Sequence, residues 1–322
     1  MKFRPFNSFQ IVDDKFIKLS QSDRLADEIF YYYSIQKFPQ KNLFAEFYGD
    51  VSDGNSYALV LKNYQHKNLY ENFKNNSKLI NLQIIDNLLE CLSSLHSGLP
   101  PNYNDSNSFN KKILIEKTEN EFEIFNKQSN ILMNHFKNKS IININGVNCL
   151  HFDKIWGQIK SIIISNYLHA DLSLIHGDFC FANILLNDEN QFILIDPRGS
   201  YHLRGCFGDK AYDYAKLLHS FHGNYEQIIY DDYKLLLEKD KVSYTFNLDF
   251  TIFQDYLSKK LDPLLFRKSK LIEGLLFISM CSRHYDNEEH QFIMYCQGLL
   301  ILNSIYKESI HDLNPLITKS AC

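Results

Sequence analysis

The chain has 322 residues, and 45% of them are apolar, which is enough for a large buried core. Its formal net charge is −4, and the Lys and Arg residues are scattered among acidic ones. Proteins that bind DNA or RNA carry a basic patch or stripe, so we expect no nucleic-acid partner.

Two further signals concern location. The seven cysteines are widely spaced and form no C-x-x-C pair, which favours reduced thiols over disulfides or a zinc site. The N-terminus shows no apolar segment with a cleavage site, and the longest apolar runs, such as "LLFISM", are too short to cross a bilayer. We therefore expect a cytoplasmic protein with no membrane partner.

The first part of the chain has the pattern of a small sheet with one helix. Residues 9–19 alternate apolar and polar side chains around a turn at Asp13, which predicts a β-hairpin. Ser22 has the position of a helix N-cap before an amphipathic run. Residues 43–64 then predict two strands joined by the turn "SDGN". Residues 1–64 are thus expected to form a β-rich lobe.

Beyond this point the apolar residues recur mainly at helical spacing. The helical segments are 77–96, with Ser77 as its N-cap, 109–128, 153–168 and about 209–306. Two short strands interrupt them between residues 184 and 195. The pattern predicts an α+β fold with two lobes and a cleft, in which residues 65–322 form the larger, mainly helical lobe.

The stretch "LIHGDFCFANILLNDENQFILIDPRG" places four polar residues beside apolar strings. His176, Asp178 and Asn183 form an H-x-D-x-x-x-x-N pattern, and Asp196 follows the run "FILI". An ordinary hairpin with Asp and Asn in its turn is the simpler explanation. The combined spacing is nevertheless that of kinase-type phosphotransferases, which need a base for the hydroxyl proton and oxygen ligands for Mg²⁺. We favour the second interpretation.

The strings "IHGDFCFANILL", "FILIDPRG" and "GDKAYDYAKLLHS" together resemble the aminoglycoside phosphotransferase and choline kinase superfamily, whose fold is protein-kinase-like. The resemblance implies that Asp178 is the catalytic base and that Asn183 and Asp196 bind Mg²⁺. It implies a scaffold role for His176 in the catalytic loop. It also implies that Asp213 is a buried anchor in the following helix.

The same resemblance implies an ATP site in the β-rich lobe. Lys18 and Glu28 match, in order and spacing, the lysine that contacts the nucleotide phosphates and the glutamate that holds it. Lys15 competes with Lys18 for this role. The backbone around Leu61 to Asn63 would contact the adenine edge.

The sequence departs from the protein-kinase pattern in two places. No glycine-rich loop precedes the first strand, where Asn7 and Ser8 are the candidates to replace it. Arg198 stands two residues after the second motif Asp, as a further catalytic candidate. Its guanidinium would neutralise phosphate charge or bind an anionic substrate, or it would pair with Asp209 or Asp213 and brace the turn.

The sequence says less about the acceptor of the phosphate than about the nucleotide site. His284 and Asp286, at the end of an apolar run, are the candidates for acceptor contacts, although a solvated helix end explains them equally well. Resemblance to bacterial capsule and surface-polysaccharide enzymes implies a sugar, polyol or amino alcohol as the small-molecule acceptor of phosphate from ATP. Choline, ethanolamine and aminoglycosides are alternative acceptors. A catalytically silent nucleotide-binding protein and a metal-dependent hydrolase are alternatives of other classes.

Overall fold

A computed structural model describes residues 7–319, except 54–55, 101–105, 129, 137, 188, 202–203 and 240. The chain divides into two compact units. Unit 1 comprises Met1–Asn104, Ala170–Leu217 and Asp255–Leu257, and unit 2 comprises Asp105–His169, Leu218–Gln254 and Ser258–Cys322. The predicted lobe boundary at residue 64 stays a prediction.

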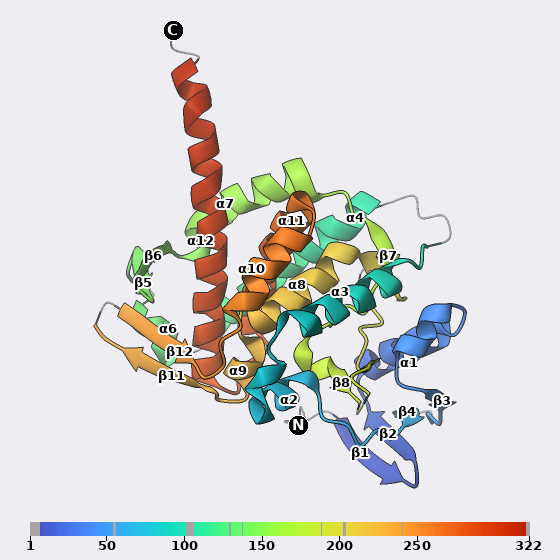
Figure 1. The fold of residues 1–322 in the computed structure, drawn as a ribbon. Coiled ribbons are helices and arrows are strands. Elements are labelled where there is room, and N and C mark those ends of the chain that lie inside the picture. Colours follow the sequence, from blue (N-terminus) through green and yellow to red (C-terminus); the bar gives the residue numbers. More distant parts are fainter. Residues whose placement is uncertain are drawn as a thin grey trace. The chain divides into compact units, whose positions relative to one another are not determined.

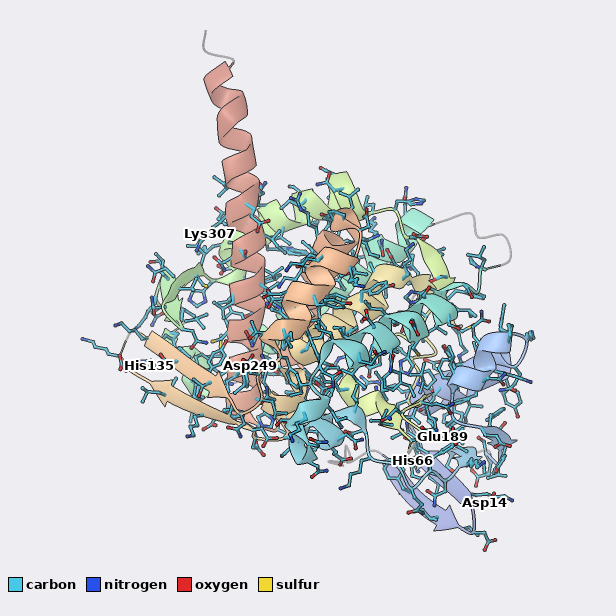
Figure 2. The ribbon with its side chains drawn as sticks, viewed as in Figure 1. Asp14, His66, His135, Glu189, Asp249 and Lys307 are labelled. Atoms are coloured by element: carbon cyan, nitrogen blue, oxygen red, sulfur yellow. The ribbon has the colours of Figure 1, made fainter. Side chains whose placement is uncertain are left out.

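Unit 1 begins with a four-stranded antiparallel sheet in the order β1-β2-β4-β3 (Figure 1). Its strands are β1 (Asn7–Val12), β2 (Lys15–Ser20), β3 (Phe47–Asp50) and β4 (Tyr57–Lys62). The predicted hairpin is confirmed, with Asp13 in the left-handed region (φ 55°) that a tight turn requires. Asp14 marks the tip of this hairpin in Figure 2. The predicted pairing of β3 with β4 is also confirmed, although residues 54–55 of the "SDGN" turn lie outside the described residues.

Helix α1 (Asp23–Ile35) follows the hairpin as expected. Ser22 is its N-cap, and the Ser22 hydroxyl accepts a hydrogen bond from the Arg24 amide. The buried face of the helix includes Tyr31 and Tyr32, which are both fully buried, and one charged residue, Glu28. A carboxylate on the apolar face of a helix requires a partner, and the Lys18 ammonium of β2 supplies it.

The rest of unit 1 joins short strands to three helices. These elements are α2 (Leu69–Asn75), α3 (Leu82–His96), β7 (Leu172–Leu174), β8 (Ile184–Leu186), β9 (Phe192–Leu194), β10 (Phe207–Asp209) and the first part of α8 (Lys210–Phe221). The predicted β8–β9 hairpin is confirmed. The predicted N-cap Ser77 is wrong: Ser77 begins a short 3₁₀ turn, and Asn81 caps α3 by accepting from the Ile84 amide.

Unit 2 is mainly helical. Its helices are α4 (Ser106–Asn110), α5 (Lys117–Lys127), α6 (Ile131–Phe136), α7 (Phe152–Ile162), α9 (Tyr225–Ile229), α10 (Thr251–Lys260, apart from Asp255–Leu257), α11 (Pro263–Cys281) and α12 (Glu288–Lys319). Turns of π-helix extend α4 and α7. Helix α11 is buried along most of its length and packs on α12 and α5. None of the helices within the described ranges is long and apolar enough to cross a membrane.

Unit 2 also contains a sheet that the helical patterns did not predict. Its strands, in the order β11-β12-β5-β6, are β5 (Ile141–Ile144), β6 (Val147–Leu150), β11 (Tyr233–Leu237) and β12 (Lys241–Phe246). The expected helical pattern over about 209–306 is therefore wrong for residues 233–246. Burial alternates along β12, where Val242 and Tyr244 are buried, as in a strand with one face in the core. Asn145 and Gly146, both at positive φ, form the turn between β5 and β6.

The six cysteines among the described residues are free, buried thiols, and Cys322 lies outside these residues. Burial raises the pKa of the Cys91 and Cys206 thiols, to about 12 and about 11. Such thiols stay protonated at neutral pH and serve as apolar packing groups rather than as nucleophiles.

Gly199 allows helix α1 to pack closely on the segment that follows β9. A Cβ at position 199 would lie 1.7 Å from the Asp27 carbonyl oxygen. We expect Gly199→Ala to lower the free energy of unfolding by about 2 kcal/mol or more, because the backbone at Asp27 or at position 199 must move to make room for the methyl group. Gly157→Ala in α7 is the control, since a Cβ at position 157 meets nothing within 4 Å. This substitution should stabilise the protein by about 0.5–1 kcal/mol, because alanine has the higher helix propensity. Guanidinium denaturation followed by circular dichroism measures both, and equal stability of the two variants would contradict the packing.

Candidate active site

A buried lysine lies at the centre of the candidate site in unit 1. The Lys18 ammonium, from β2, lies 2.7 Å from Glu28 Oε2 of α1 and also donates to Asp196 Oδ1, just after β9. The Lys18 and Glu28 side chains are 9% and 8% exposed. Lys15, the competing candidate, is an exposed residue of the same strand. The structure thus brings together Lys18, Glu28 and Asp196.

The charges of this cluster are strongly coupled. Burial lowers the pKa of Lys18, but the Asp196 and Glu28 carboxylates outweigh it and raise that pKa above its ordinary value. Burial raises the pKa of Glu28, against the opposing effect of Lys18. Desolvation also favours the neutral form of Asp196, yet the Lys18 ammonium holds the Asp196 pKa below its usual range. Asp196 is therefore an anion at neutral pH.

His176 has a structural position in the loop after β7. Its Nδ1 accepts a hydrogen bond from the Asp178 amide at 3.1 Å, and its Nε2 lies 2.9 Å from the Ile195 carbonyl oxygen. A carbonyl accepts, so Nε2 carries the proton and the ring is neutral. Burial lowers the His176 pKa, which agrees with this state. His176 thus connects the loop that carries Asp178 to the strand end that carries Asp196.

Asp213 of α8 anchors the same loop. Its carboxylate, fully buried, accepts from the amides of His176 at 2.9 Å and Gly177 at 2.6 Å and lies 3.1 Å from His96 Nε2. Gly177 has φ 75°, and a Cβ there would overlap the Tyr201 hydroxyl. The arrangement gives Asp213 the anchoring position that the resemblance implied. His96 was not predicted, since it ends α3 outside any motif.

Asn183 and Lys216 hold the Asp178 side chain from opposite oxygens. Asn183 Nδ2 donates to the Asp178 carbonyl at 2.9 Å and to Asp178 Oδ2 at 3.1 Å. The Lys216 ammonium lies 2.8 Å from Asp178 Oδ1. Sequence reasoning missed Lys216, although it lies three residues after Asp213 and so shares its helix face.

The predicted magnesium ligands suit a hard cation. Because Asn183 Nδ2 is directed to Asp178, the Asn183 amide oxygen is directed elsewhere, and Asp196 offers an ionised, partly exposed carboxylate. Amide and carboxylate oxygens are ligands that Mg²⁺ prefers. The described residues contain no cluster of three or more His, Cys, Asp or Glu side chains placed to hold a metal. The role of Asn183 and Asp196 as magnesium ligands stays a prediction.

Arg198 braces the turn after Asp196. Its amide donates to the His176 carbonyl at 2.8 Å, its Nε donates to the Ser200 carbonyl at 2.8 Å, and its guanidinium lies 4.9 Å from the centre of the Tyr201 ring. A further guanidinium nitrogen donates to the Tyr212 hydroxyl at 3.1 Å. These contacts support the bracing role, with carbonyl and hydroxyl acceptors. A contact of Arg198 with phosphate or an anionic substrate stays a prediction.

The predicted adenine-binding segment is part of the sheet. Leu61 is buried in β4, and the Asn63 amide donates to the Asp14 carbonyl at 2.6 Å. An adenine edge at this position would therefore meet groups other than the Asn63 amide. Asn7 and Ser8 begin β1, and residues 1–6 lie outside the described residues. Their predicted contact with phosphates stays a prediction.

The two predicted acceptor residues lie in unit 2, whereas Asp178 lies in unit 1. They follow α11 in the turn that precedes α12. The His284 ring contacts the Tyr225 ring edge-on at 6.2 Å between centroids, and Asp286 is exposed. Their role toward an acceptor stays a prediction.

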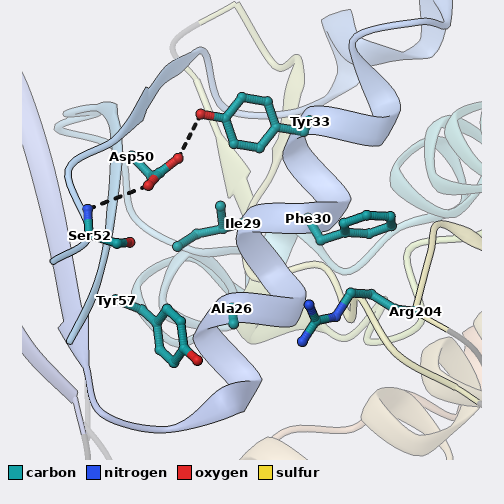
Figure 3. Close-up of a pocket in the computed structure, with 8 residues that line it drawn as sticks. All are labelled: Ala26, Ile29, Phe30, Tyr33, Asp50, Ser52, Tyr57 and Arg204. Carbon is teal, nitrogen blue, oxygen red and sulfur yellow. Dashed lines mark hydrogen bonds between the residues drawn. The ribbon is translucent and has the colours of Figure 1, made fainter. Parts of the chain in front are cut away.

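Unit 1 also has a shallow pocket of about 280 Å³ between α1 and the β3–β4 region (Figure 3). Tyr33 donates to Asp50 at 2.6 Å on its rim. The pocket is lined by Ala26, Ile29, Phe30, Tyr33, Asp50, Ser52, Tyr57 and Arg204. These residues include none of the predicted site residues, so the pocket is separate from the candidate catalytic groups.

The order of the elements and the geometry of these residues define the fold of the chain. A strand lysine paired with a helix glutamate, a loop with paired Asp and Asn, and an Asp after the next hairpin are parts of kinase-type phosphotransferases. The chain has an α+β, protein-kinase-like fold, with a β-rich N-terminal region and a mostly helical C-terminal part.

Solved structures give particular relatives of this fold. The structure of aminoglycoside phosphotransferase APH(4)-Ia has a TM-score of 0.58 and 9% identity, over 94% of this chain and 92% of that chain. A thermostable mutant of APH(4)-Ia in ternary complex with AMP-PNP and hygromycin B has a TM-score of 0.58 and 11% identity over the same shares. Choline kinase from Cryptosporidium parvum Iowa II has a TM-score of 0.50 and 12% identity, over 99% and 91%. No protein-family model and no curated protein sequence matches this chain.

The neutral state of His176 predicts an acid-sensitive fold. Its pKa is lowered in the folded state, so its contribution to stability is present above about pH 6.5 and is lost as the pH falls toward the folded value. His176→Asn should reduce the slope of unfolding free energy against pH by up to about 1.4 kcal/mol per pH unit. Urea denaturation between pH 7 and 5 measures it. An unchanged slope in His176→Asn would contradict the assignment of a buried, neutral imidazole.

Proposed function

We propose that this protein is an ATP-dependent phosphotransferase that transfers the γ-phosphate to a hydroxyl of a small molecule. The observation that supports it best is the presence of two sets of paired side chains in unit 1. Lys18 links Glu28 to Asp196, while Asn183 holds Asp178. In phosphoryl transfer the protein mainly positions groups and stabilises charge, and this set of side chains supplies both functions.

In this proposal each side chain has a defined task. Asp178 accepts the proton of the acceptor hydroxyl while that oxygen attacks the γ-phosphorus and the bond to the leaving ADP oxygen breaks. Lys18 binds the nucleotide phosphates, and Glu28 keeps the ammonium in place. Asn183 and Asp196 hold Mg²⁺, which when bound neutralises charge on the phosphate oxygens.

The acceptor and its pathway are proposed on resemblance. We propose a sugar, polyol or amino alcohol as acceptor, and a role in capsule or surface-polysaccharide synthesis. The likeness of "IDPRG", "GDKAYDYAKLLHS" and "LLFISMCSRHYDN" to bacterial enzymes of that kind supports this assignment. Release of ADP from ATP, measured with sugars, polyols, amino alcohols and aminoglycosides as acceptors, tests it. Absence of acceptor stimulation together with absence of ATP binding in calorimetry would overturn the proposed function.

Asp178→Asn tests the catalytic base. We expect transfer to fall by about 10²-fold or more, because the amide does not take up the hydroxyl proton. Binding of Mg·ATP, measured by calorimetry, should change by less than about threefold, since Asp178 faces the acceptor in this proposal. Unchanged turnover in this variant would contradict the assignment.

Lys18→Met tests the nucleotide site, with Lys15→Met as its matched control on the same strand. Loss of the buried ammonium should weaken ATP binding by about tenfold or more, and loss of the exposed one should leave binding within about threefold. Calorimetric titration with Mg·ATP measures both. Equal effects of the two substitutions would assign no special role to Lys18.

A further inference from the structure

Lys216 is a charged residue that the assigned roles leave unexplained. It lies on α8 in unit 1, is 7% exposed, and its ammonium is 2.8 Å from Asp178 Oδ1. Burying an ammonium is costly unless a carboxylate pairs with it. The carboxylate that pairs with Lys216 is the proposed catalytic base, so any acceptor hydroxyl that reaches Asp178 comes close to this ammonium.

The contacts of Lys216 and Asn183 determine the orientation of the Asp178 carboxylate. Lys216 contacts Oδ1 of the Asp178 carboxylate and Asn183 contacts Oδ2. Two donors on opposite oxygens fix the rotation of the carboxylate plane. An ionised carboxylate has about four acceptor sites, so each of its oxygens accepts more than one hydrogen bond. The Asp178 side chain is 39% exposed, which leaves it accessible to an acceptor.

The second consequence concerns charge. An unpaired aspartate attracts a cationic acceptor, whereas the charges of Asp178 and Lys216 sum to zero. A positive group next to the reacting hydroxyl would lie within a few ångströms of the Lys216 ammonium and be repelled by it. An uncharged polyhydroxyl compound has no such group.

We propose that Lys216 positions Asp178 and selects acceptors whose reacting hydroxyl has no neighbouring cation, that is, sugars or polyols rather than amino alcohols. This inference rests on the proposed phosphotransferase function and narrows its acceptor class. Lys216 itself takes no proton in the step: the hydroxyl proton goes to Asp178 as the new O–P bond forms and the bond to ADP breaks.

Matched acceptor pairs test the selection. The pairs are glycerol and 2-amino-1,3-propanediol, 3,3-dimethylbutan-1-ol and choline, and N-acetylglucosamine and glucosamine, in which one member is neutral and the other carries a cation. The wild-type protein should prefer the neutral member by about tenfold or more in kcat/KM. Lys216→Met should reduce that preference by about tenfold.

Two variants serve as controls. Lys216→Arg keeps the charge and should keep the preference within about threefold. Lys210→Met removes another lysine of α8, paired with Asp171 at 2.5 Å, and should change neither rate nor preference. A purely structural role of Lys216 would lower the rates for both members of a pair equally, so an unchanged preference in Lys216→Met would overturn the inference. A wild-type preference for the cationic members would also overturn it.

The proposed function and this inference fail differently. If no acceptor of either kind is phosphorylated, the proposed function fails and the inference fails with it. If cationic acceptors are phosphorylated and Lys216→Met does not alter the preference, only the inference fails.

Unfolding midpoints of Asp178→Asn, Lys216→Met and the double variant check the ion pair independently. We expect the double variant to shift less than the sum of the single shifts, and additive shifts would contradict the pair.

Discussion

The buried ammonium of Lys18 is the constraint on which the site depends. Removing a lysine from water costs several kcal/mol, and only well-placed carboxylates offset that cost. Here these carboxylates come from two other segments, Glu28 on α1 and Asp196 after β9. Forming the ion cluster therefore fixes the positions of β2, α1 and the end of β9 together. Gly199 lets this last segment approach the α1 backbone closely enough for the cluster to form.

A second set of contacts closes the segment between His176 and Asp196. His176 Nε2 donates to the Ile195 carbonyl, the Ile195 amide donates to the Asn183 carbonyl at 3.0 Å, and the Arg198 amide donates to the His176 carbonyl. These bonds bring the two ends of the segment together. The paired apolar strands β8 and β9 form the hairpin between Asn183 and Asp196. These strands therefore fix the spacing of Asp178, Asn183 and Asp196 within unit 1.

The sequence contained the parts of the site that are close in the chain or have an established spacing. The family resemblance implied Lys18 and Glu28, which match its lysine and glutamate in order and spacing, and local spacing revealed the H-x-D-x-x-x-x-N pattern. Lys216 and His96 were not, because their importance depends on pairings with residues 38 and 117 positions away, which no local pattern contains. The β5–β6 hairpin carried a local signal, the Asn-Gly turn, which the helical patterns around it obscured.

The ion pairs of Lys18 and of Lys216 give the two ends of the proposed site different charge environments. At one end, the two carboxylates Glu28 and Asp196 share a single ammonium, and Asp196 stays ionised, so this end suits a divalent cation with its phosphates. At the other end, Asp178 and Lys216 form a pair of zero net charge. A phosphotransferase that accepts amino alcohols would need the opposite balance at its base, with negative charge left over for the substrate cation. In this chain Lys216 offsets the charge of the base, and this pair leaves no surplus negative charge for a substrate cation.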